Sequence, residues 1–150
     1  MQRAVSVAPA GTWAADSAQD RIVLMSDERF RRRARLATVS GIEFMLDLPQ
    51  ATMLKGGDGL AFEDGGLVLV EAAAEALVEV SAEDPSTLAR LAFHIGNRPV
   101  PVEIRGDCLR IRDDRVIVAM LRRMGARVRR LKAPFNPESG AYAEGQHGHD

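Results

Sequence analysis

Apolar and polar residues alternate with a period of two in the first half of the chain. Between positions 42 and 48 every second residue is apolar, which places four apolar side chains on one face of a strand. In residues 29–36 arginines alternate with other residues, and Ser40 with Gly41 supplies a tight turn between the two runs. The pattern predicts a β-hairpin. Two shorter apolar segments, 60–62 and 67–70, are bounded by glycine-rich turns and extend the prediction to a small β-rich domain.

After residue 74 the spacing of apolar residues changes. A short strand predicted at 77–80 precedes Asp84, a suitable N-cap, and Pro85, whose missing amide hydrogen costs nothing at the first helical position. Apolar residues then recur at i, i+3, i+4 and i+7, as in a helix that ends near Gly96: Leu88, Leu91, Ala92 and Ile95. Strands are predicted at 100–104 and 108–111. A second helix follows, capped by Asp113 or Asp114 and ending near Gly125, and then a last strand at 127–131.

The order strand, helix, strand, strand, helix, strand is that of the ferredoxin-like βαββαβ motif. The sequence therefore predicts an α+β protein, with a β-rich N-terminal domain at 1–74 and a ferredoxin-like domain at 75–133. Residues 134–150 are predicted to be an irregular segment and a histidine-containing tail, with Phe135 and Tyr142 pinning the first part to the domain. In the ferredoxin-like domain two helices cover one face of the sheet, which leaves the other free to meet a partner.

Composition and charge exclude several classes of protein. The formal net charge of -1 gives no general attraction to nucleic acid, and no apolar run approaches the roughly 20 residues that cross a bilayer. We expect no nucleic-acid partner, no membrane partner and a cytoplasmic location. The arginines at 29–35 have two interpretations: a phosphate-binding surface, or one solvated face of the hairpin. The second is favoured because no aromatic residues are interleaved for base stacking.

An enzyme is not predicted. Cys108 and His94 are the obvious nucleophile and base candidates, and no third group is placed by a motif to orient them. Cys108 is the only cysteine, so the chain has no internal disulfide, and we expect it to be a small buried hydrophobic residue.

The most informative run is residues 94–101, HIGNRPVP, which carries the only histidine outside the tail. Together with residues 134–142, PFNPESGAY, and the histidine-bearing tail, it resembles the urease accessory protein UreE family. The resemblance covers nearly the full length, including the arginine-rich hairpin and the turn at Gly57 and Asp58.

The resemblance implies a non-enzymatic function. Members of the family are homodimeric nickel chaperones in which a β-rich domain precedes a ferredoxin-like metal-binding and dimerisation domain. They deliver nickel to apo-urease together with other accessory proteins, including the GTPase UreG. Nickel(II) is bound well by imidazole nitrogen, as are zinc and copper, and exchangeable ligands favour release to a client.

The sequence departs from the family pattern at its metal site. The family usually has a histidine after the glycine, asparagine and arginine of this run, where the chain has Pro99, which offers no side-chain donor. Auxiliary histidines that some relatives place at the positions of residues 112–115 are also absent. The remaining candidate metal ligands are His94, His147 and His149.

Other interpretations of these positions stay open. His94 could cap or pack at the helix end, and the two tail histidines could be incidental residues of a solvated terminus. An alternative function is a non-enzymatic docking module for urease accessory proteins that binds metal weakly because residue 99 is proline.

Overall fold

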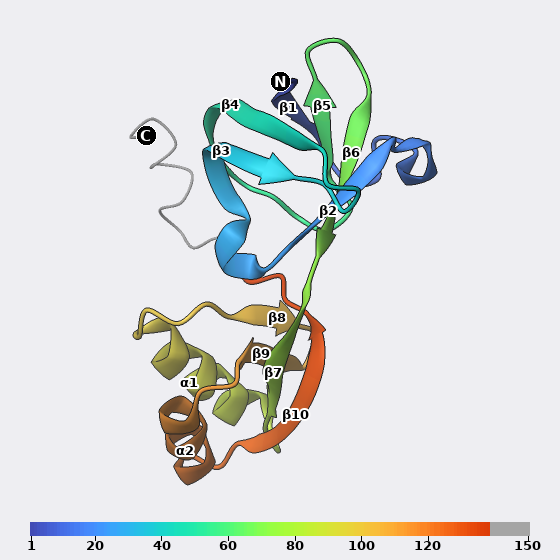
Figure 1. Ribbon diagram of the computed structural model, residues 1–150. Coiled ribbons are helices and arrows are strands. Elements are labelled where there is room, and N and C mark those ends of the chain that lie inside the picture. The colour runs from blue at the N-terminus through green and yellow to red at the C-terminus, as the bar shows by residue number, and fades with distance from the viewer. Residues whose placement is uncertain (139–150) are drawn as a thin grey trace. The chain divides into compact units, whose positions relative to one another are not determined.

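The structure is a computed structural model that describes residues 1–138 as two compact units, Met1–Ala73 and Ala74–Glu138 (Figure 1). Strands dominate both units, and the second also contains two α-helices. The predicted α+β class is confirmed. Within residues 1–138, no helix is both long enough and apolar enough to cross a membrane.

The first unit is a six-stranded sheet in the order β2-β6-β5-β1-β4-β3. Its strands and two short 3-10 helices are β1 (Arg3–Ala8), η1 (Ala15–Ser17), β2 (Asp20–Leu24), η2 (Ser26–Glu28), β3 (Phe30–Ala37), β4 (Glu43–Met53), β5 (Gly59–Phe62) and β6 (Leu67–Ala72). Its core is formed by inward side chains of β1, β2, β4, β5 and β6, and in it the Phe44 and Phe62 rings meet edge to face at 5.4 Å.

The predicted hairpin is confirmed as β3 and β4, joined by a turn in which Gly41 has φ +87°, a conformation that favours glycine. Three of the four apolar residues predicted on one face are buried, but Ile42 precedes β4 and is 55% exposed. The alternation predicted for residues 29–36 is wrong at its start. Arg29 is buried outside the strand, and a register shift between Arg31 and Arg33 leaves Phe30 43% exposed.

The favoured interpretation of the arginines at 29–35, one solvated face of the hairpin, holds for Arg33 and Arg35, which are exposed, whereas Arg29 is buried and Arg31 and Arg32 are half-buried. The carboxylate of Asp47 on β4 accepts hydrogen bonds from Arg33 and from Arg3 of β1, and Glu43 accepts one from Arg35 at 2.6 Å. These carboxylates occupy the guanidinium groups of the two exposed arginines, Arg33 and Arg35, which argues against a phosphate-binding surface there.

Two strands of the first unit were not predicted from the sequence. In β1 only Ala4 is buried, and β2 is a short strand that pairs in parallel with β6. β1 lacks the repeated large apolar residues that made β4 recognisable, whereas β2 buries Ile22 and Leu24 in alternation, a pattern too short to stand out in the sequence.

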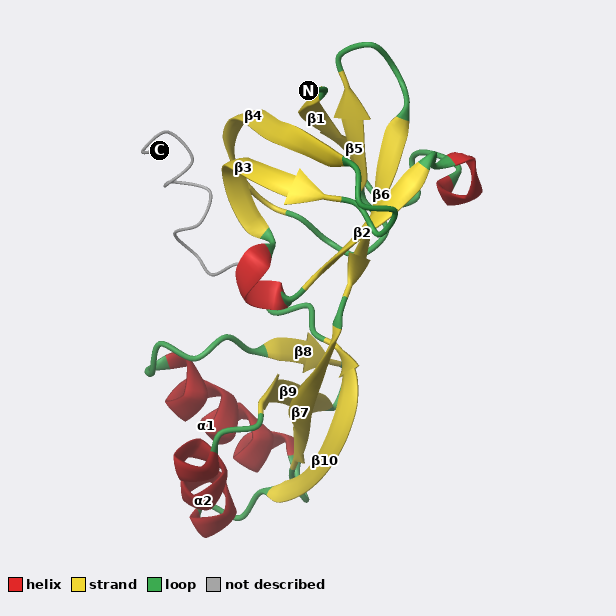
Figure 2. Ribbon diagram, viewed as in Figure 1, coloured by secondary structure: helices red, strands yellow, loops and turns green. Residues whose placement is uncertain are grey.

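The second unit is a four-stranded sheet with two helices on one face (Figure 2). Its elements are β7 (Ala74–Ser81), α1 (Pro85–Gly96), β8 (Glu103–Arg105), β9 (Cys108–Arg112), α2 (Arg115–Arg123) and β10 (Arg127–Pro134). The strand order β10-β7-β9-β8 and the antiparallel pairing of β7 with both neighbours confirm the predicted ferredoxin-like arrangement.

The ends of several of these elements differ from the prediction, and the strand predicted at 77–80 runs from Ala74 to Ser81. The strand predicted at 100–104 is shorter, because Val100 and Val102 pack against the core without joining a strand and β8 begins at Glu103. The last strand is longer and continues to Pro134, paired with Ala74.

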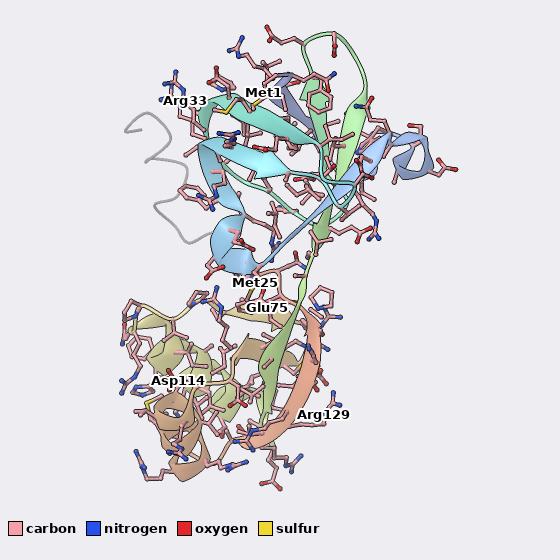
Figure 3. The ribbon with its side chains drawn as sticks, viewed as in Figure 1. Met1, Met25, Arg33, Glu75, Asp114 and Arg129 are labelled. Carbon is pink, nitrogen blue, oxygen red and sulfur yellow. The ribbon has the colours of Figure 1, made fainter. Side chains whose placement is uncertain are left out.

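The two faces of this sheet differ in chemistry. Apolar side chains of β7 and β9 point toward the helices. In this core, the strand residues Val78, Val80, Leu109 and Ile111 are buried against Leu91, Ile95 and Leu121 of the helices. The register places charged residues on the opposite face, where Arg110 and Arg129 both bond Glu79 (Arg129 is labelled in Figure 3). Ion pairs therefore link β7 to both neighbouring strands on this face, which also carries the fully buried Leu77.

Candidate functional site

Helix α1 presents His94 at its last turn. Asp84 begins the helix by accepting the Thr87 amide hydrogen at 2.7 Å, and Leu91 with Ile95 fixes its orientation by burial in the core. His94 lies on the exposed side of the helix, and its ring meets the Phe93 ring edge to face at a centroid distance of 5.4 Å. His94 is therefore not a core-packing residue. Within residues 1–138, its imidazole has no hydrogen-bond partner.

The turn after α1 carries Pro99 on the surface. The Asn97 amide donates to the Phe93 carbonyl at 3.1 Å, and the Arg98 amide donates to the Ile95 carbonyl at the same distance. The Val100 amide then donates to the Arg98 carbonyl at 2.7 Å, which closes a tight turn around Pro99. The backbone places position 99 where a side chain faces outward, but proline offers no metal donor there.

The end of α1 and the start of α2 lie at the same end of the sheet. Strands β7 and β9 are antiparallel, with Leu77 opposite Arg112; α1 returns from the far end of β7, and α2 starts directly after β9 (Figure 1). The two large apolar side chains that are most exposed in this unit are found there, Phe93 at 64% and Val116 at 70%. We call Phe93, His94 and Val116 the helix-end patch.

The segment after β10 is fastened to the strand region that follows the turn. Phe135 is fully buried, and the Arg112 guanidinium lies 5.6 Å from the centre of its ring. The Asn136 amide donates to the Glu103 carboxylate, and the Glu138 amide donates to the Val102 carbonyl, both at 2.8 Å. The last described residue is thus held beside Val102, three positions after Pro99.

The candidate residues of the C-terminal tail are not tested by the structure. His147, His149 and Tyr142 lie outside the described residues, so their positions as metal ligands or as a packing residue stay predictions. The predicted role of Phe135 in pinning the segment agrees with its complete burial.

Glu103 is a residue that the sequence analysis missed. It is 5% exposed and joins the Asn136 amide to the Arg105 guanidinium, which lies 2.8 Å from the carboxylate. In the sequence Glu103 is a carboxylate between the apolar residues Val102 and Ile104. That pattern does not distinguish a buried carboxylate that binds a distant amide, here called a latch, from a solvated one.

Three of the residues at 112–115, where some relatives have histidines, perform structural roles. Arg112 pairs with Glu75 at 3.3 Å, Asp113 accepts from Arg130 at 3.0 Å, and Asp114 caps α2 by accepting the Val116 and Ile117 amides (Asp114 and Glu75 are labelled in Figure 3). Over residues 1–138, no group of three or more histidine, cysteine, aspartate and glutamate side chains is close enough to hold a metal ion.

Cys108 is half-buried and is not the core residue that was predicted. Its thiol donates to the Arg105 carbonyl at 3.4 Å, and burial, reinforced by the charges of Glu79 and Asp107, raises the pKa of that thiol. A cysteine whose pKa is raised is a poor nucleophile at neutral pH.

Comparison with known proteins agrees with this arrangement over the whole chain. Residues 3–73 match the family model described as UreE urease accessory protein, N-terminal domain, and residues 75–150 match the C-terminal domain of the same family. Among similar proteins is a urease accessory protein UreE of Bradyrhizobium sp. (strain ORS 278), 50% identical over 99% of this chain and 70% of its own length.

Two further relatives match closely in length. The urease accessory protein UreE of Beijerinckia indica is 50% identical over 100% of this chain and 87% of its own. That of Rhodobacter capsulatus is 49% identical over 100% of this chain and 93% of its own. With both family models matched in order and identity near one half along the full chain, this protein belongs to the UreE family of urease accessory proteins.

Proposed function

We propose that this protein binds nickel(II) as a homodimer and delivers it to apo-urease during assembly of the urease metal centre. The observation that carries the proposal is the fastening of residues 135–138 beside Val102, because it fixes where the histidine-bearing tail starts. As a family member the chain is a chaperone of urease maturation and not an enzyme.

The metal ligands we assign are His94, His147 and His149. His147 lies nine positions after Glu138, so a tail imidazole can lie up to about 30 Å from the anchored residue. That range includes the short stretch from Val102 back to Pro99. Imidazole suits nickel(II), and it also accepts zinc or copper in vitro.

A single tail is a weak ligand set. Ordering a segment of chain around an ion costs roughly 1 to 2 kcal/mol of backbone entropy per residue, and one tail offers only two imidazoles. A dimer brings two tails and two copies of His94 together, so that several imidazoles share one ion. Ligands held in this way exchange readily, which suits release to a client.

The helix-end patch supports the proposed dimer. Exposed Phe93 and Val116 are apolar groups at one end of the helical layer, and a two-fold contact would cover each with its copy. His94 on the same patch would then face its counterpart. The dimer would act with apo-urease and with other accessory proteins, among which we propose the GTPase UreG.

Calorimetric nickel titration tests the assignment. We expect about one ion per dimer, bound by imidazoles, with most of the binding lost in the double variant His147→Ala/His149→Ala. Gln146→Ala is the matched control in the same segment and should bind as the unaltered chain does. Undiminished binding by the double variant would sink the tail assignment, and an unaltered chain without nickel binding would sink the function itself.

A further inference from the structure

A groove of about 880 Å³ opens between the start of α1 and the β8–β9 hairpin of the second unit. Its apolar lining includes Leu88, Ala89 and Ala92 from the helix, and Ile104 and Leu109 from the hairpin. Ile104 and Leu109 are paired and point to the same face of the sheet, yet Leu109 is 3% exposed and Ile104 is 57% exposed. The small side chains of Ala89 and Ala92 leave the groove open where larger ones would fill it.

The rim of this groove is acidic. Glu83, Asp84 and Asp107 are exposed on it, and Arg127 is the one cation among the residues that line it. The Asp84 carboxylate accepts a hydrogen bond from the Thr87 amide. Glu79, which also lines the groove, forms ion pairs with Arg110 and Arg129. Glu83 and Asp107 form no ion pair with any residue of 1–138.

This local charge contrasts with the rest of the unit. Residues 77–132 contain 12 arginines and lysines against seven aspartates and glutamates, so the acidic rim is a local concentration in a basic domain. A carboxylate rim repels the phosphates of nucleic acid and of anionic lipid, and it attracts lysine and arginine. An exposed isoleucine above small residues adds a pocket for an apolar side chain.

We propose that this groove docks a segment of a partner protein in which an apolar side chain lies next to lysine or arginine residues. The inference rests on the proposed function, because the partner it implies is another protein of urease assembly. The apolar side chain enters beside Ile104, and the basic residues face Glu83 and Asp107. The groove lies at the start of α1, at the opposite end of the helix from His94.

Peptide probes of defined charge test the groove directly. The probe is a fluorescein-labelled ten-residue peptide with two leucines and three arginines among glycine and serine, measured by fluorescence anisotropy on the full chain. Two control peptides have the same length: in one, glutamate replaces each arginine, and in the other, serine replaces each leucine. We expect binding of the first peptide only, weakened by added salt because the attraction is electrostatic.

Variants of the protein locate the binding. Glu83→Lys/Asp107→Lys should weaken the arginine peptide at least tenfold, and Ala89→Leu, which narrows the groove, should weaken it without a change of charge. Asp16→Lys/Asp27→Lys is the matched control, because both aspartates are exposed in the first unit and form no ion pair with any residue of 1–138. The proposal would be overturned if the glutamate control peptide bound as tightly as the arginine peptide, or if the control variant of the protein lost as much affinity for the arginine peptide.

Nickel calorimetry and urease activation separate this proposal from the proposed function. In cells with a complete set of urease genes, Glu83→Lys/Asp107→Lys should lower urease activation while the purified variant keeps its full nickel binding. Undiminished activation would overturn the docking site and leave nickel delivery standing. An unaltered chain that binds the arginine peptide but no nickel would instead refute the proposed function.

Discussion

The carboxylate of Glu79 on β7 accepts two hydrogen bonds from the Arg110 guanidinium of β9, both at 3.3 Å. Its other oxygen accepts one from Arg129 of β10 at 3.2 Å. One side chain therefore ties the three longest strands of the second sheet across the face that the helices leave uncovered. Arg129 and Arg110 hold the pKa of Glu79 below its usual range by hydrogen bonding and charge, against a smaller opposing effect of burial.

Replacing Glu79 by glutamine should destabilise the protein by on the order of 1 kcal/mol, because the amide keeps an acceptor but loses the charge that both arginines face. The measurement is urea unfolding at neutral pH. The change should shift the midpoint without altering the slope, since the surface exposed on unfolding stays the same.

The pH dependence of Glu79 has a definite sign. Because its folded pKa is lowered, the ionised carboxylate stabilises the fold above the unfolded pKa, and this stabilisation is lost as the pH falls through the folded value. Stability of the unaltered chain should therefore drop more steeply in acid than that of Glu79→Gln. Parallel stability curves for the two proteins would contradict the assignment.

The elements predicted best from the sequence are those in which large apolar residues recur at the spacing of a strand or a helix. β4 was recognisable because alternate large apolar residues must be buried, and α1 because Asp84 and Pro85 mark its start and Leu88 to Ile95 repeats at helical spacing. β1 was missed since its one buried residue, Ala4, is small, and Val7 is only partly buried against the core. A sheet partner far along the chain, and not its own pattern, makes that segment a strand.

In the candidate site too, local features could be predicted from the sequence and long-range contacts could not. The exposed position of His94 and the absence of a donor at Pro99 follow from a capped helix and a turn that sequence can locate. The Glu103 latch could not be predicted, because its contact with Asn136 spans 33 residues and depends on where β10 delivers the chain. Long-range contacts of that kind carry no local signature.

Glu103→Ala should loosen the segment that precedes the tail. Without the carboxylate the Asn136 amide loses its acceptor, and its hydrogen exchange should rise together with that of the Glu138 amide. If the latch concentrates the tail histidines near His94, nickel affinity should fall about tenfold.

The control for the latch is Glu103→Gln, whose side-chain oxygen can still accept the Asn136 amide hydrogen. It should keep slow exchange and most of the nickel affinity. Fast exchange in Glu103→Ala with unchanged nickel affinity would show that the anchored segment does not position the tail.

Phe93→Glu should convert the proposed dimer to monomer. A charge at the centre of an apolar contact is costly to bury, and two copies would face each other across a two-fold axis. Sedimentation velocity across a range of protein concentrations measures the change. Ile42→Glu, at a comparably exposed apolar position of the first unit, should leave the oligomeric state unaltered.

Pro99→His tests whether two copies of the turn meet in the dimer. Position 99 is exposed and its nitrogen donates no hydrogen bond, so the substitution removes no contact that the turn requires. If the proposed two-fold contact brings the two turns together, a pair of imidazoles is added to the ligand set. Nickel affinity should then rise at least tenfold, about 1.4 kcal/mol, and depend less on His147 and His149.

Pro99→Ala separates the two effects of this change. Both substitutions relax the backbone of the turn, but only histidine adds a donor, so alanine should leave nickel affinity as it is in the unaltered chain. Equal affinities for the histidine and alanine variants would mean that the two turns lie apart in the dimer. In that case His94 and the tail would have to hold the ion away from position 99, and the helix-end patch would not be the contact between protomers.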